Sequence, residues 1–84
     1  RRHDKLIKHQ EFLFMNFIRS RYYLPPGKVD EAFIIKLERK SGVEKDQFMP
    51  ILKSFVFARK SINISDDFLI KLHNNIENFY KKYI

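Results

Sequence analysis

Apolar residues recur every three or four positions in four separate stretches of this chain, which is the spacing of amphipathic helices. Short groups of helix breakers and capping residues separate the stretches: Pro-Pro-Gly at 25–27, Gly42 and Ser65. Only residues 61–64 favour extended backbone, between the third stretch and the fourth. The pattern predicts an all-α fold, a compact bundle of four helices with short connections, built as one domain from residues 1–84.

The first predicted helix, from about Asp4 to Tyr23, carries an unusually wide apolar arc. The arc consists of two neighbouring stripes, expected to face inward: Leu6, Leu13 and Phe17 on one, Ile7, Phe14 and Ile18 on the other. Met15 and Tyr22 extend it further. A wide arc means that a helix packs on more than one flank, so we expect this helix at the centre of the bundle. Phe12 projects towards the polar side and is a candidate exposed anchor.

Local signals set the ends of the other three helices. Asp30 is a good N-cap for the second, and Gly42 suits the left-handed position that ends it. The third covers roughly Lys45 to Lys60, and Pro50 removes a backbone hydrogen bond within its first two turns unless this helix starts later or is kinked. Ser65 caps the fourth. The residues expected to face inward are Phe48, Ile51, Leu52, Phe55 and Val56 in the third helix, and Phe68, Leu69, Leu72, Ile76, Phe79 and Tyr83 in the fourth.

Composition excludes several classes of protein. With no cysteine, the chain has no disulfide, no thiolate metal site and no cysteine nucleophile. No apolar run approaches the ~18 residues that a transmembrane helix needs, and no signal-peptide pattern is present. The chain begins without methionine. We therefore expect it to be a fragment of a longer protein, in which a membrane segment can lie just outside this fragment.

The sequence offers no catalytic or metal-binding motif. His3 and His9 are six residues apart, which does not place them together on one helix face, and His73 is remote from both. Gly27 and Gly42 are the only glycines, too few for a loop that cradles phosphate. No serine stands in a nucleophile-elbow setting. We expect no enzyme activity, no cofactor and no metal.

Positive charge gathers in the N-terminal part of the chain. The net charge is +4 over residues 1–24, +3 over residues 25–60 and zero over residues 61–84, giving +7 in all. Such a field attracts phosphates, anionic lipid or an acidic partner protein, or only keeps a small domain soluble. The run from Arg1 to Lys8 is a candidate for lipid contact.

Arginine and tyrosine form a patch at the end of the first predicted helix, with Arg19, Arg21, Tyr22 and Tyr23. Two guanidinium groups beside aromatic rings suit a phosphate, a carboxylate-rich partner or a base face. The simpler interpretation is that the cations complement the helix dipole and the rings cover the core. Together with Phe12, these four residues are the candidate partner-binding residues.

The corner Ser41-Gly42-Val43, between two predicted helices, resembles a helix-turn-helix in outline. The recognition helix would then present Glu44, Lys45, Asp46 and Gln47 to DNA. Two of these four side chains are acids, which phosphate repels. Glu38 also stands where the motif favours a small residue. Nucleic-acid binding through the basic half therefore stays the alternative, and we interpret the corner as structural.

Several segments in order carry a resemblance to a known family: His3–Ile7, Phe17–Leu24, Lys40–Val43, and Ile64–Leu69 followed by Ile76–Lys82. They resemble the C-terminal soluble tail of a family of uncharacterised bacterial membrane proteins that are encoded beside MoxR-type AAA+ ATPases. The resemblance implies a helical module after a transmembrane helix, on the cytoplasmic face of the inner membrane. It carries over no binding residues.

We therefore expect a non-enzymatic cytoplasmic module that mediates protein–protein interaction or assembly for a membrane-anchored protein. The expected partner is a MoxR-type AAA+ ATPase or a neighbouring membrane protein.

Overall fold

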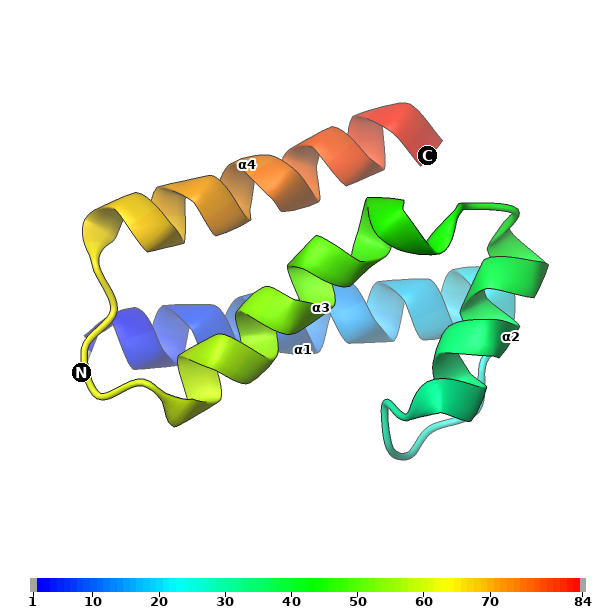
Figure 1. The fold of residues 1–84 in the computed structure, drawn as a ribbon, viewed down its shortest axis with the longest axis horizontal. Coiled ribbons are helices and arrows are strands. Elements are labelled where there is room, and N and C mark those ends of the chain that lie inside the picture. The colour runs from blue at the N-terminus through cyan, green and yellow to red at the C-terminus, as the bar shows by residue number, and fades with distance from the viewer. Residues whose placement is uncertain (1, 84) are drawn as a thin grey trace.

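The computed structural model describes residues 2–83, which form four α-helices and, within that range, no strand. The helices are α1 (Arg2–Tyr22), α2 (Glu31–Ser41), α3 (Lys45–Lys60) and α4 (Asp66–Tyr83) (Figure 1). The prediction of an all-α bundle of four helices is confirmed, and each predicted helix end lies within two residues of the observed one.

The first helix is the centre of the bundle, as its wide apolar arc predicted, because α1 contacts each of the other three helices. In Figure 1, α1 and α4 run in the same direction, α3 returns across α1, and α2 stands at the far end of the molecule. Nε2 of His3 lies 2.6 Å from Oδ1 of Asp66, which brings the N-terminal ends of α1 and α4 together.

Capping residues mark where helices begin and end, at the positions that the sequence predicted. Oδ1 of Asp30 accepts a hydrogen bond from the backbone N–H of Phe33 at 3.0 Å. Gly42 ends α2 in the left-handed conformation, with φ of 73°. Oγ of Ser65 accepts from the N–H of Phe68 at 3.1 Å. Asp30 and Ser65 thus pair backbone N–H groups at the start of a helix, and the N–H of Gly42 pairs the carbonyl of Glu38 at the end of α2.

The α2–α3 corner is held by side chains of α2. Oε2 of Glu38 accepts a hydrogen bond from the N–H of Lys45 at 3.1 Å, and so caps the first turn of the next helix. Oγ of Ser41 accepts from the N–H of Val43 at 3.1 Å. The third helix then continues through Pro50, which lies inside it. The structural interpretation of this corner agrees with these contacts.

The core lies mainly between α1, α3 and α4, α2 adds Phe33 and Leu37 to it, and aromatic rings meet inside it. The ring of Phe14 lies 5.5 Å from that of Phe79, 6.0 Å from Phe55 and 6.1 Å from Tyr80, centroid to centroid. The other buried apolar residues are Ile7, Met15, Ile18, Leu24, Phe33, Leu37, Val43, Phe48, Ile51, Leu52, Leu72 and Ile76.

Three residues expected in the core are not there. Leu6 and Leu13 are each 50% exposed, and Val56 is 43% exposed. Neighbouring residues of an α-helix point about 100° apart, so α1 can bury the stripe of Ile7 and Phe14 while the stripe one residue earlier stays at the margin. The prediction for this stripe of α1 was therefore wrong for Leu6 and Leu13, whereas its third member, Phe17, packs against the core.

Candidate functional site

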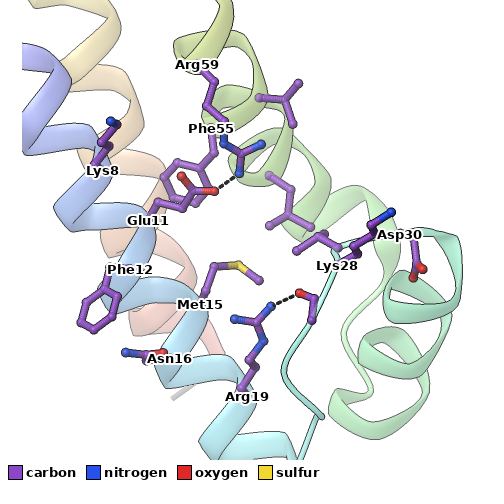
Figure 2. Close-up of a pocket in the computed structure, with 14 residues that line it drawn as sticks. Lys8, Glu11, Phe12, Met15, Asn16, Arg19, Lys28, Asp30, Phe55 and Arg59 are labelled. Atoms are coloured by element: carbon purple, nitrogen blue, oxygen red, sulfur yellow. Dashed lines mark hydrogen bonds and ion pairs between the residues drawn. The ribbon is translucent and has the colours of Figure 1, made fainter.

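A groove of about 700 Å³ runs between α1, α3 and the loop that joins α1 to α2. We call it the α1–α3 groove (Figure 2). Its lining residues are Lys8, Glu11, Phe12, Met15, Asn16, Arg19, Gly27, Lys28, Val29, Asp30, Leu52, Phe55, Val56 and Arg59. Its volume exceeds those of four other pockets on the described residues, which range from about 180 to 260 Å³.

Helical periodicity builds both walls of the groove. On α1 the lining residues recur three or four positions apart from Lys8 to Arg19, and on α3 they do so from Leu52 to Arg59. Residues with that spacing share one helix face. The two faces lie opposite each other, and the backbone of residues 27–30 closes the third side.

The groove has a buried apolar floor and a more exposed apolar rim. Met15, Leu52 and Phe55 belong to the core and form the floor. Val56, which is 43% exposed, stands on the rim, and Phe12, which is 61% exposed, lies at the outer edge on α1 with its ring directed away from the opening in Figure 2. Figure 2 shows the Met15 side chain directed from α1 into the middle of the opening.

Two polar bridges cross the groove, one at each end of the opening. Near Lys8, the guanidinium of Arg59 on α3 donates to the carboxylate of Glu11 on α1. At the other end, Nη2 of Arg19 donates to the carbonyl oxygen of Gly27 at 2.7 Å. Both bonds are drawn as dashed lines in Figure 2. They join α1 to α3 and to the loop, and so define the opening between them.

The charge of the groove is positive. Four cationic side chains line it, against the two carboxylates of Glu11 and Asp30. Each carboxylate already accepts a hydrogen bond within the chain, Glu11 from Arg59 and Asp30 from the N–H of Phe33. The side chains of Lys8 and Lys28 are exposed. The two carboxylates therefore only partly offset the attraction that the four cations exert on an anionic group in the groove.

The arrangement suits binding. Nowhere between residues 2 and 83 do three or more His, Asp or Glu side chains gather as a metal site requires. The groove instead combines apolar surface, hydrogen-bond donors and positive charge, which together can hold an elongated segment that is both apolar and anionic.

The candidate residues from the sequence fall into two groups. Phe12 and Arg19 line the groove, whereas Arg21, Tyr22 and Tyr23 do not. Tyr22 packs against the core, as the simpler interpretation of the patch expected. Tyr23 is 83% exposed, so its ring does not cover the core. The Arg-Tyr patch is thus not one site.

Arg19 has a structural role that the sequence did not reveal. Besides its bond to the carbonyl of Gly27, its guanidinium lies over the ring of Phe33, with the carbon Cζ 5.6 Å from the centroid. Cation–π contacts of this kind contribute about 0.5–1 kcal/mol at exposed sites. Arg19 therefore fixes the α1–α2 loop and α2 against α1.

The polar face of the α2–α3 corner carries acids, as the sequence indicated. Glu44, Lys45, Asp46 and Gln47 are exposed at the start of α3. The Glu38 carboxylate lies beside them, bound to the N–H of Lys45. Three carboxylates thus stand where a recognition helix would approach phosphates, and repulsion there opposes DNA binding.

Only part of the candidate lipid-binding run can be placed. Arg1 and the side chain of Arg2 lie outside the described residues, whereas Lys5 and Lys8 are exposed. As for membrane crossing, none of the helices within residues 2–83 has both the length and the apolar content that a bilayer span requires.

Comparison with models of protein families shows the family of this chain. The model of the family described as the DUF4350 C-terminal helical domain matches residues 1–83. The chain belongs to this family. In this DUF4350 domain, the four helices agree with the helical character that the description states. This match confirms one part of the resemblance, namely that the chain is the helical C-terminal part of a family of unknown function. No curated protein and no solved structure matched the chain.

Proposed function

We propose that this domain is a non-enzymatic protein-interaction module that binds a segment of a partner protein in the α1–α3 groove. The observation that carries the proposal is the apolar surface of the groove, in which the exposed Val56 stands beside the buried Met15, Leu52 and Phe55 of the floor. Apolar surface of this kind, bordered by polar groups, is typical of interaction sites. The flexible thioether of methionine adapts to different side chains, which favours a binding surface.

The proposal extends to the setting of the domain. The ordered segments that resemble the tail of the bacterial membrane-protein family support a membrane-anchored parent, with this module on the cytoplasmic face of the inner membrane. On that basis the partner is a MoxR-type AAA+ ATPase encoded nearby, or a neighbouring membrane protein. Binding would assemble the partner with the membrane-anchored parent.

A photo-crosslinking experiment in the parent protein tests this function. A crosslinking amino acid replaces Val56 on the groove rim, and a second variant carries it at Ile35 of α2 as a control. The two positions are matched, with Val56 43% and Ile35 48% exposed, and Ile35 does not line the groove. We expect a discrete crosslinked partner from position 56 alone. Equal crosslinking at both positions, or none at either, would count against the proposal.

Nucleic-acid binding is the alternative, and the net charge of +7 is the observation in its favour. It predicts association with DNA that weakens steeply as salt rises, because binding releases counterions from the phosphates. A titration with duplex DNA at low salt separates the two functions. A flat titration removes the alternative, and tight, salt-dependent binding would replace the main proposal.

A further inference from the structure

We infer that the α1–α3 groove accepts an acidic, amphipathic peptide segment, with apolar side chains over Met15 and carboxylates towards the cations at either end. The inference rests on the proposed function and names the chemistry of its partner. Its evidence is the distribution of charge and apolar surface along the groove.

The cations lie at both ends of the groove. Lys8 and Arg59 stand near the Glu11 bridge, and Arg19 and Lys28 stand near the Gly27 bridge. Because α1 rises 1.5 Å per residue, Lys8 and Arg19 are separated by about 16 Å along the helix, roughly three turns. A helical segment of similar length presents carboxylates to both ends while its centre covers the floor.

Arg19 retains hydrogen-bonding capacity towards such a segment. Its Nη2 donates to Gly27 and its Nε is buried, but Arg19 as a whole is only partly buried, so donors at the tip of its guanidinium face the groove. A guanidinium carries five N–H donors in a planar fork, which suits a carboxylate. A partner carboxylate at this end can therefore pair with Arg19 without releasing the loop.

The apolar floor favours a peptide over nucleic acid. Single-stranded nucleic acid binds through a positive groove that carries several aromatic faces on which bases stack. In the α1–α3 groove the only strongly exposed aromatic side chain is Phe12, because Phe55 is buried in the floor. The remaining apolar lining is aliphatic or thioether, which suits the leucine, isoleucine or phenylalanine of an amphipathic segment.

An NMR titration of the 84-residue chain tests the inference with three synthetic peptides of about twelve residues, a length that spans roughly three helical turns. The first has leucines at the centre and glutamates at both ends. The second replaces the glutamates by lysines, and the third replaces the leucines by serines. We expect only the first to shift the amide signals of the groove, with affinity at least about tenfold above either of the others, or about 1.4 kcal/mol.

Two charge-reversal variants serve as a matched pair. Lys28→Glu inverts a cation of the groove, and Lys53→Glu inverts an exposed cation of α3 outside it. Both change the net charge equally, so a general field effect weakens binding equally. We expect Lys28→Glu to weaken the acidic peptide about fivefold to tenfold more than Lys53→Glu does, as loss of a close charge pair would.

Several outcomes would overturn the inference. These are equal binding of the acidic and basic peptides, shifts confined to another surface, equal losses in the two lysine variants, or no binding of the acidic peptide. An oligonucleotide that displaces the acidic peptide from the groove at low salt would assign the site to nucleic acid. Failure of the peptides alone leaves the proposed function standing if Val56 crosslinks to a partner, whereas failure of both experiments removes the function as well.

Discussion

The two flanks of α1 are closed by different kinds of contact. Towards α4, aromatic rings meet: Phe14 lies 5.5 Å from Phe79 and Phe17 lies 5.2 Å from Tyr80, between ring centroids. Towards α3, the rings of Phe14 and Phe55 also meet in the core, but at the surface the contacts to α3 and the loop are the two polar bridges, and the space between the bridges stays open as the α1–α3 groove. The α4 flank of α1 is thus closed by rings, whereas the α3 flank combines a packed floor with an open surface that is free to bind.

The difference follows from how each kind of contact is stabilised. Packed rings gain free energy in proportion to the apolar surface removed from water, and edge-to-face pairs add about 0.5–1.5 kcal/mol. Exposed ion pairs such as Glu11–Arg59 contribute at most about 1 kcal/mol. The α4 flank therefore should carry much of the stability, and the groove flank can change its side chains with little loss of fold. Paired substitutions on α1 test this division.

The largest effect is expected from Phe14→Ala. Phe14 is 1% exposed and contacts rings of both α3 and α4, so removing its ring leaves a cavity and lowers the free energy of unfolding by about 3–5 kcal/mol. Phe12→Ala, two residues away on the groove side, should change it by less than about 0.5 kcal/mol. Urea unfolding followed by circular dichroism measures both. Similar losses in the two variants would contradict the division of α1.

A smaller effect is expected from Arg19→Ala, with Arg21→Ala as its control. Arg19 donates a hydrogen bond to the carbonyl of Gly27 and covers the ring of Phe33. Water weakens both contacts because Arg19 is only partly buried. Its substitution should therefore lower the free energy of unfolding by only about 1 kcal/mol. Arg21 is exposed, and its substitution should change that free energy little.

Hydrogen exchange supplies a second measurement of Arg19→Ala. Amides around Leu24 should exchange faster in this variant, because the bridge from α1 to the loop is gone. Equal exchange in the two arginine variants would show that the bridge does not hold the loop.

The helix ends could be predicted from the sequence because capping is local chemistry. Asp30, Gly42 and Ser65 act on backbone groups within a few residues of themselves. The buried half of the α1 arc could not be predicted in the same way. Leu6 and Ile7 fit the apolar pattern equally well, and only the direction from which α3 and α4 approach decides that Ile7 is buried.

The candidate site was predictable only in part, for the same reason. Phe12 was identified because it interrupts the polar side of its own helix. Val56, Arg59 and Lys28 were missed, because each shares the groove with residues of α1 that are distant in the sequence. The available signal was the three-or-four-residue spacing that runs from Lys8 to Arg19, with charged residues at both ends. Such spacing identifies a face, whereas the tertiary arrangement decides what lies opposite it.

The smallest expected effect concerns the hydroxyl group of Tyr80, whose ring belongs to the aromatic contacts of the α4 flank. Burial raises the pKa of the Tyr80 hydroxyl above its ordinary value of 10.0, and the nearby Glu77 carboxylate raises it further. The folded protein therefore holds this proton more tightly than the unfolded chain does. The corresponding stabilisation is complete below pH 10.0 and is lost as the pH rises through the folded pKa.

Tyrosinate absorbance isolates this group when the titration of the Tyr80→Phe variant is subtracted from that of the unchanged protein. We expect the difference to titrate with a midpoint above 10.0 in the folded state and to return to the ordinary value in urea. Glu77→Gln should lower the folded midpoint only in part, because burial is the larger cause of the shift. A folded midpoint at or below the ordinary value would mean that water reaches the Tyr80 hydroxyl freely, and the α4 flank would then be less closed than its ring contacts imply.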